Sequence, residues 1–200
     1  MASSKPIISL GADRHQQIVR TLAHAFQEDP ALSWIFPDAD ARRARLPLMF
    51  DFIVPLDLRD GIALGADAGE AATLWRAPGK AETSMLDSLL RLMPILRCFG
   101  RATTRALGIA DAIERSHPRD FDFWYLHYAG VSPEHQGKGW GGAAIRSGIE
   151  RANAEGKPVW LETATESNVG LYRSLGFEVR SEWDAPDGGP HFWSMLRPVG

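Results

Sequence analysis

A glycine-rich turn is the part of this sequence whose residue types most clearly indicate chemistry. It runs from Gln136 to Gly142 (QGKGWGG) and follows residues 121–131, which are rich in aromatic and aliphatic side chains typical of a buried strand. The residues after the turn predict a helix. Such a turn presents unpaired backbone N–H groups at the positive end of a helix dipole, and this arrangement binds phosphate. The pattern therefore predicts a ligand that carries phosphate.

Two common phosphate motifs fit the turn less well. The Walker pattern needs Ser or Thr after its lysine, whereas a glycine follows Lys138. The glycines do spell G-x-G-x-x-G, and Glu162 follows about twenty residues later, as in dinucleotide-binding units. However, residues 132–136 separate the strand from the first glycine, and only residues 163–200 remain after Glu162. This is too short for the rest of a doubly wound sheet, so the dinucleotide motif is disfavoured.

The spacing Gln136-x-x-Gly139-x-Gly141 resembles the acyl-CoA signature of the GCN5-related N-acetyltransferase (GNAT) family. A second segment, residues 168–177 (NVGLYRSLGF), is similar to the N-x-x-x-Y-x-x-x-G-F element of the same family. Both motifs occur in the family's order and at its usual distance. The resemblance extends over residues 121–197, whereas the first 120 residues match only loosely.

The resemblance implies an α/β fold with a mixed, mostly antiparallel central sheet, a splayed parallel strand pair and flanking helices, in one domain over residues 1–200. It implies an N-acetyltransferase that moves the acetyl group of acetyl-CoA to a primary amine of a small molecule or a peptide. The amine would attack directly in a ternary complex. A non-catalytic acyl-CoA sensor with the same fold is the alternative.

The resemblance also implies which residues bind and react. The strand backbone at Ala129, Gly130 and Val131 would pair with the pantetheine arm and polarise the thioester carbonyl. Asn168 would hydrogen-bond the same arm, and Tyr172 corresponds to the family's tyrosine acid, which protonates the departing thiolate. The residues expected to bind the pyrophosphate are Gln136, Gly137, Lys138, Gly139, Trp140 and Gly141.

The general base is left open by the sequence. Glu162 lies near a strand end, where burial could raise its pKa enough to accept a proton near neutral pH. His127 already has a suitable pKa when unperturbed. Many family members instead deprotonate the amine through ordered water. The six histidines show no metal-binding spacing, so no metal is expected.

The elements around the turn must bring these residues together. Residues 159–163 predict a second strand, and the order strand, helix, strand predicts a parallel pair with a right-handed crossover. This order places the turn and Glu162 at one edge of the sheet. Gly130 inside the first strand predicts a bulge or the close approach of another chain or a ligand. A short helix capped by Ser167 would present Asn168 and Tyr172 on one face and direct Leu171 to the core.

The rest of the chain predicts a scaffold of helices and hairpins. Trp34 and Phe36 are candidates for the acceptor wall, although burial in the core is the commoner fate of large aromatic residues. Two strands are expected at 61–66 and 71–76, and two more at 177–183 and 191–196. Periodic apolar positions predict helices over 13–28, 41–58, 83–99 and 103–115.

Composition limits the class of protein and its partners. The chain is 44% hydrophobic and 24% charged with a net charge of −3, which is ordinary for a soluble protein and makes nucleic acid an unexpected partner. Cys98 is the only cysteine, so no internal disulfide forms. No apolar run is long enough for a membrane span. We expect a cytoplasmic protein, monomeric or homodimeric.

Overall fold

A seven-stranded sheet forms the centre of the protein, here described by a computed structural model that covers residues 5–82 and 92–200. The strand order is β1-β2-β3-β4-β5-β7-β6. All neighbours are antiparallel except β4 and β5, which are parallel. This confirms the predicted mixed, mostly antiparallel sheet. The strands are β1 (Ile8–Ser9), β2 (Gly61–Gly65), β3 (Ala71–Arg76), β4 (Trp124–Val131), β5 (Val159–Thr163), β6 (Glu178–Asp184) and β7 (His191–Arg197).

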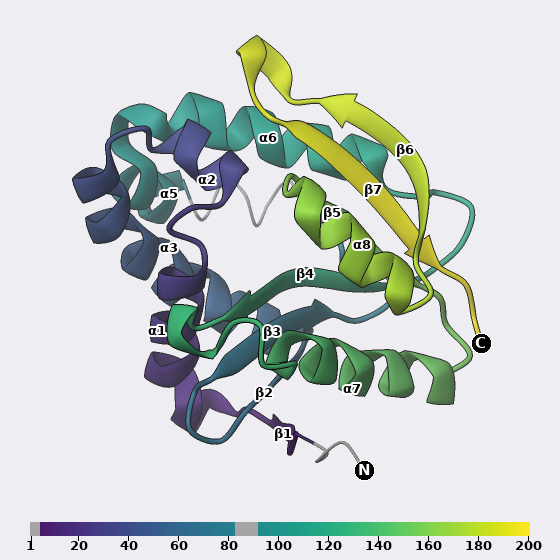
Figure 1. Cartoon of the computed structure of the whole chain (residues 1–200). Helices are drawn as coiled ribbons and strands as arrows, with labels where there is room; N and C mark the ends of the chain where they lie inside the picture. The colour runs from purple at the N-terminus through teal and green to yellow at the C-terminus, as the bar shows by residue number, and fades with distance from the viewer. Residues whose placement is uncertain (1–4, 83–91) are drawn as a thin grey trace.

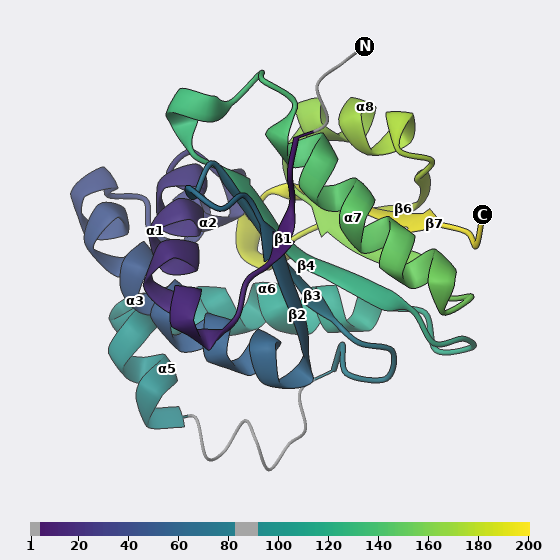
Figure 2. The same ribbon diagram turned by 90° about the horizontal axis from the view of Figure 1, so that it is seen from below.

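Helices cover both faces of the sheet (Figure 1, Figure 2). One layer holds α1 (His15–Ala25), α2 (Pro30–Ile35), α3 (Ala39–Asp60), α5 (Leu92–Phe99) and α6 (Thr103–Ser116). The other layer holds α7 (Trp140–Ala154) and α8 (Glu166–Ser174). Short 3₁₀ turns are η1 (Ala12–Arg14), η2 (Gly100–Ala102), η3 (Pro133–His135) and η4 (Pro186–Gly188). Of the helix predicted over 83–99, the structure describes the part that forms α5 (Leu92–Phe99). Residues 83–91 lie outside the described residues.

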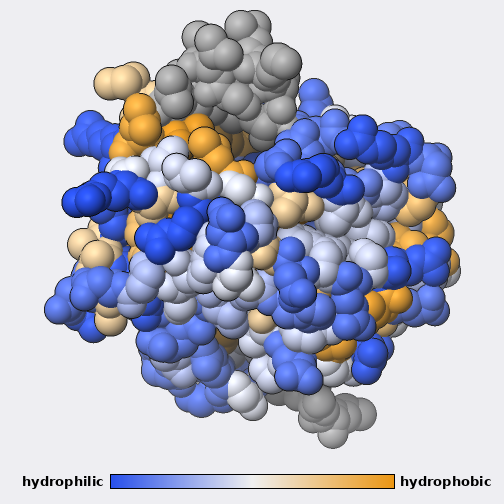
Figure 3. Space-filling model, turned by 90° about the horizontal axis from the view of Figure 1, so that it is seen from above, coloured by the Kyte–Doolittle hydropathy of each residue, from blue (hydrophilic) through white to orange (hydrophobic). Residues whose placement is uncertain are grey.

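Apolar side chains reach the surface in several places. The face seen in Figure 3 is mostly hydrophilic, with apolar residues at the upper left and a second group on the right. Among the exposed apolar side chains, Met93 of α5 is 74% exposed. Within residues 5–82 and 92–200, no helix has the length and apolar character needed to cross a membrane.

Apolar clusters on both sides of the sheet hold the layers together. The alternation of β3 divides its side chains between them: Leu74 faces α1 and α3, and the buried Trp75 faces α7. The Trp75 indole fills the space over Gly148 of α7, where an added Cβ would lie 2.1 Å from the indole Cζ2. The glycine therefore sets how closely α7 packs on the sheet.

The parallel pair diverges soon after it forms. Only Trp124 with Val159 and Tyr125 with Trp160 are in register between β4 and β5. From Leu126 onward β4 keeps its antiparallel partner β3 but has no partner on the β5 side. The predicted splay is thereby confirmed, and it leaves the end of β4 with a free edge in the middle of the sheet.

The bulge in β4 lies at His127, not at Gly130. Leu126 and Tyr128 pair with consecutive residues of β3, which leaves His127 as the extra residue. Gly130 serves the helix layer: a Cβ there would lie 2.8 Å from Ala25 Cβ and 2.9 Å from Leu22 Cδ2 of α1. Of the two alternatives predicted for Gly130, the bulge is wrong, and the close approach at this residue is that of helix α1.

Two smaller predictions, on Ser167 and Leu171, also differ from the structure, whereas core burial of Phe36 was the favoured interpretation. Thr165, not Ser167, occupies the N-cap of α8, and no side chain bonds there. Leu171 is exposed, because the buried face of α8 is formed by Val169 and Tyr172. Phe36 is buried in the core and stacks on Phe99, so the commoner fate of a large aromatic residue applies to it.

Replacing Gly148 with Ala should destabilise the protein, because the new methyl group must displace the Trp75 indole. Overpacking of this kind lowers the free energy of unfolding by about 1–3 kcal/mol. Gly170→Ala in α8 is the matched control: no atom lies within 4 Å of a Cβ there, and alanine should stabilise the helix by about 0.5–1 kcal/mol. Urea denaturation measures both. Equal effects would contradict the packing at Gly148.

Candidate active site

The glycine-rich turn adopts a backbone that favours glycine. Gly137 has φ 71° and Gly139 has φ 83°, both in the left-handed region. Gly139 is also the N-cap of α7. At both positions an added Cβ would have no atom of the described residues within 4 Å. The turn is therefore an open surface on which a ligand can reach the backbone directly.

The amides at the start of α7 have no partner within the helix. No side chain caps this helix, and the first bond runs from the Ala143 N–H to the Gly139 carbonyl, at 3.1 Å. This leaves the N–H groups of Trp140, Gly141 and Gly142 at the positive end of the helix dipole. An anion such as a pyrophosphate fits this arrangement.

Two side chains of the turn bond to backbone next to it. Gln136 Nε2 donates to the Val131 carbonyl at 3.3 Å, and Lys138 Nζ donates to the Glu134 carbonyl at 2.8 Å. These bonds hold the turn against the end of β4. Lys5 adds a positive charge from the other end of the chain, with Nζ 4.7 Å from the ring centre of Trp140.

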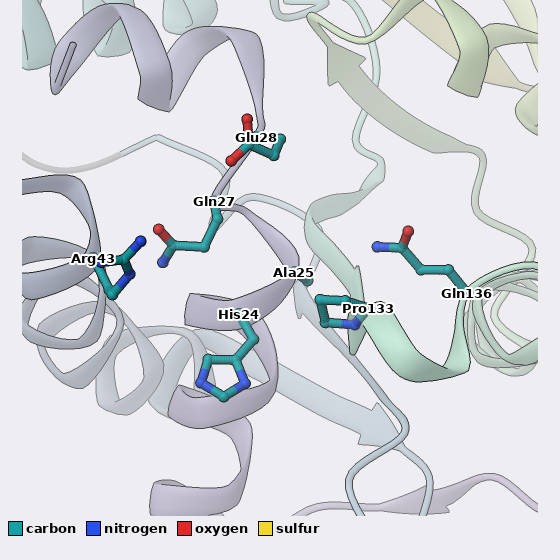
Figure 4. A pocket seen from close by; sticks show the side chains of 7 residues that line it. All are labelled: His24, Ala25, Gln27, Glu28, Arg43, Pro133 and Gln136. Carbon is teal, nitrogen blue, oxygen red and sulfur yellow. The ribbon is translucent and has the colours of Figure 1, made fainter. Parts of the chain in front are cut away.

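A cavity of 440 Å³ opens beside the turn (Figure 4). Polar and charged side chains from α1, from α3 and from the segment between α1 and α2 line it together with the start of the turn. The lining residues are His24, Ala25, Gln27, Glu28, Arg43, Pro133 and Gln136. The cavity therefore joins the turn to the region between α1 and α3, where the sequence predicts the acceptor site.

Glu162 lies in β5 with its side chain buried towards α6. The carboxylate is 2% exposed, and its Oε1 accepts from Ser116 Oγ at 3.0 Å and from Trp160 Nε1. His117 Nε2 lies 3.6 Å from the same oxygen. Oε2 is buried and has no hydrogen-bond partner among the described residues. The structure thus places Glu162 under the sheet, on the α6 side.

His127 forms a pair that the sequence did not reveal. The bulge directs it towards α3, where its Nδ1 lies 2.7 Å from Oδ2 of Asp57. Asp57 is fully buried, and its Oδ1 accepts from Arg76 Nε at 2.8 Å. Asp57 continues the buried face of α3 three residues after Val54. An acidic residue on such an apolar face is the signal that could have identified it.

The charges around this pair set its protonation. Burial raises the pKa of Asp57, but His127 and Arg76 outweigh burial, and the pKa is lowered overall. The pKa of His127 is lowered below 6.5, first by burial and then by the charge of Arg76, against the opposing effect of Asp57. At neutral pH the pair is therefore a carboxylate beside a neutral imidazole.

Tyr172 lies on the opposite face of the sheet from Glu162. It is 7% exposed and packs in the apolar cluster beneath α7 and α8, edge to face with Phe177. Burial, followed by the charge of Asp29, raises the pKa of the phenol to about 12. The hydroxyl is therefore protonated at neutral pH and able to donate. Asn168 lies one turn earlier in α8 and is partly exposed.

Metal ligands do not gather near these residues. Across residues 5–82 and 92–200, the His, Cys, Asp and Glu side chains form no group of three or more that could hold a metal ion.

Several known proteins that are similar to this chain are named as acetyltransferases. The acetyltransferase (GNAT) family matches residues 78–177. An uncharacterised N-acetyltransferase of Schizosaccharomyces pombe is 30% identical over 179 residues, which cover 83% of this chain and 71% of that protein. A crystal structure from Corynebacterium glutamicum, named as a histone acetyltransferase and related acetyltransferase, matches with a TM-score of 0.74 and 26% identity over 97% of this chain and 96% of its own.

Two further structures share the fold at lower identity. Arylalkylamine N-acetyltransferase 2 of Aedes aegypti matches with a TM-score of 0.70 and 14% identity, over 98% of this chain and 99% of that chain. A polyamine N-acetyltransferase of Drosophila melanogaster, which forms N-acetylagmatine, matches with a TM-score of 0.63 and 15% identity, over 96% and 99%. At these identities the likeness is one of fold.

Asp57→Ala should strongly destabilise the protein, because it leaves Arg76 buried without its carboxylate. Removing one partner of a buried ion pair costs about 3–5 kcal/mol. Asp51→Ala is the control. Asp51 lies 2.7 Å from His15, as Asp57 does from His127, but Asp51 is largely exposed. Loss of the Asp51 carboxylate should cost less than about 1 kcal/mol. Thermal denaturation compares the two variants. Similar losses would show that the Asp57 pair contributes no more than a surface pair.

Proposed function

Because the chain belongs to the acetyltransferase (GNAT) family, we propose that it transfers the acetyl group of acetyl-CoA to a primary amine, by direct attack in a ternary complex. The observation that carries this proposal is the free edge of β4 beside the open glycine turn. Acetyl-CoA is an extended molecule with a pyrophosphate and two amide groups. A free strand edge that ends at an anion-binding turn matches both features.

In this proposal, backbone groups bind most of the cosubstrate. Ala129, Gly130 and Val131 supply N–H and carbonyl groups to the pantetheine arm, as an added strand would, and an N–H there polarises the thioester carbonyl. The turn from Gln136 to Gly141 binds the pyrophosphate, and Asn168 bonds the arm. The unpaired amides of α7 and the open space at the glycines fit such a ligand.

We propose that Tyr172 donates a proton to the thiolate as CoA leaves. The raised pKa of its phenol keeps the proton in place until the thiolate forms. Holding the amine and the thioester together contributes the remaining rate enhancement through proximity. The sequence also predicted Glu162 as the base that deprotonates the amine. Its burial and its hydrogen bonds with Ser116 and Trp160 leave it little access to an amine.

We propose a small-molecule amine as the acceptor, with a peptide amine as the alternative. The Aedes and Drosophila proteins named above are arylalkylamine and polyamine acetyltransferases. The cavity beside the turn offers the carboxylate of Glu28, which would attract a cationic amine. Arg43 also lines the cavity, and its guanidinium pairs with Asp40 at 2.7 Å, which offsets its charge.

An acceptor screen tests the activity. Acetyl-CoA is mixed with agmatine, spermidine, 2-phenylethylamine or a peptide with a free amino terminus, and CoA release is measured.

Tyr172→Phe should lower kcat by about 10²-fold or more while CoA affinity stays the same, because the substitution removes only the proton donor of the departing thiolate. Binding of CoA without turnover of any amine by the wild type would instead support the sensor alternative.

Gly139→Ala should weaken CoA binding by at least about tenfold. The new methyl group would occupy the space beside the free amides of α7, and alanine would strain the left-handed backbone. Gly156→Ala is the control: its φ is 61°, an added Cβ there has nothing within 4 Å, and it lies beyond the other end of α7. Both variants should lose about 1–2 kcal/mol of stability. Isothermal titration calorimetry measures the CoA affinity of each variant, and only Gly139→Ala should lose affinity. Equal affinities would mean that the pyrophosphate does not bind at this turn.

A further inference from the structure

We infer that His127 takes the proton from the acceptor amine and that Asp57 is the positioning residue that holds it for this task. The inference rests on the proposed function, because it names the base of that reaction. It is carried by the contact between His127 Nδ1 and Asp57 Oδ2, by the bulge in β4, and by the access that each candidate base has to the gap between β4 and β5.

The bulge explains why a histidine at this position faces the reaction. In a regular strand, His127 and Tyr128 would point to opposite faces. With the extra residue at His127, both side chains turn towards the layer of α1 and α3, where Tyr128 packs on Phe26 and Phe50. His127 therefore lies on the part of β4 that has left β5, and it comes from the same strand that would hold the thioester.

Asp57 fixes which nitrogen of the ring is basic. A carboxylate accepts hydrogen bonds, so the proton of the neutral imidazole sits on Nδ1 and the lone pair on Nε2. Among the described residues, Nε2 has no hydrogen-bond partner, and 17% of the His127 side chain is exposed. Arg76 holds the other oxygen of Asp57, which prevents the carboxylate from turning away.

The groups that face His127 come from three further elements as well as its own strand. They are Asp57 from α3, Arg76 from β3, Glu162 from β5, and Tyr125 and Tyr128 from β4. Arg76 and burial favour the neutral ring, and the two carboxylates favour the charged one. The neutral ring prevails at rest, and Asp57 stabilises the imidazolium once a proton arrives.

Glu162 is less well placed than His127 for contact with an amine. Its carboxylate is enclosed by Ser116, Trp160 and His117 beneath the sheet. Its negative charge still acts on His127 and favours the protonated ring. Glu162 then supports the imidazolium from a distance and does not touch the substrate.

The protons in the reaction balance as follows. The ammonium of the acceptor gives one proton to His127 Nε2, which later releases it to solvent. The neutral amine nitrogen attacks the thioester carbonyl carbon, a C–N bond forms and the C–S bond breaks. Tyr172 protonates the leaving sulfur and recovers a proton from the attacking nitrogen. The products are the acetamide, CoA and one released proton.

Nitrogen-15 NMR of the wild-type protein tests the tautomer without any mutation. His127, assigned by its absence from His127→Gln, should show a protonated Nδ1 and an unprotonated Nε2 at neutral pH. Its titration midpoint should lie below that of a free histidine, at 6.5. A protonated Nε2, or a ring charged at pH 7, would overturn the inference, because Nε2 could then accept no proton.

Kinetics test the role itself, with the amine that turns over fastest in the acceptor screen. His127→Gln should lower kcat/KM at pH 7 by about 10²–10⁴-fold and move the acidic limb of the pH profile up to the pKa of the amine, with unchanged CoA affinity. The loss should shrink at high pH, where the amine is already neutral. His15→Gln is the control, since His15 contacts Asp51 at the same 2.7 Å on the surface, and it should change nothing.

Asp57→Asn tests whether Asp57 acts on His127 or only stabilises the fold, because only the first role changes the pH profile. Without the carboxylate, burial and Arg76 lower the pKa of His127 further, so the acidic limb should shift to lower pH while kcat falls.

If the wild type turns over and His127→Gln stays within about threefold of it, the inference fails and the proposed function stands. If the wild type neither binds CoA nor releases it with any amine, the proposed function itself fails.

Discussion

The structure depends on the point where β4 stops pairing with β5. An unpaired strand edge inside a sheet leaves backbone donors and acceptors without partners, and such groups are costly unless something bonds them. Here the scaffold maintains the edge from the opposite side. Pairing with β3 continues to Val131, and Gly130 allows α1 to pack directly on the strand. The gap is therefore built into the fold, and an extended ligand is the partner that would complete the sheet.

In the proposed reaction, the two faces of the sheet supply different parts of the chemistry. Tyr172 lies on the α8 side, in an apolar setting that keeps its phenol protonated. His127 lies on the α3 side, in a charged setting that keeps its imidazole neutral. A thioester held between β4 and β5 would thus have a proton donor on one face and a proton acceptor on the other. This separation lets acid and base coexist at one pH without neutralising each other.

The sequence predicted what is local and missed what arises from tertiary contacts. The turn from Gln136 to Gly142 and the strand at 159–163 were predicted because glycine spacing and apolar runs act over a few neighbours. The roles of Tyr172 and Asn168 were inferred from the resemblance to the family, and they remain predictions. Asp57 was missed because its partners lie 19 and 70 residues away along the chain.

The position of the bulge shows the same limit. Gly130 is the residue that local rules associate with a bulge, but the register places it at His127, because strand register is set by packing on both faces. Leu171 was expected in the core from helical spacing, yet α8 is rotated so that Val169 and Tyr172 are buried. Such rotations depend on the neighbouring layer and are not written in the helix alone.

Amide hydrogen exchange with and without CoA tests the central claim most directly, because it reports the backbone groups of the gap themselves. CoA should slow exchange at residues 129–131 and 137–142, on the free edge of β4 and in the glycine turn, with little change in β2 or β6. Unchanged exchange at these residues under saturating CoA, or protection confined to another part of the sheet, would contradict the account.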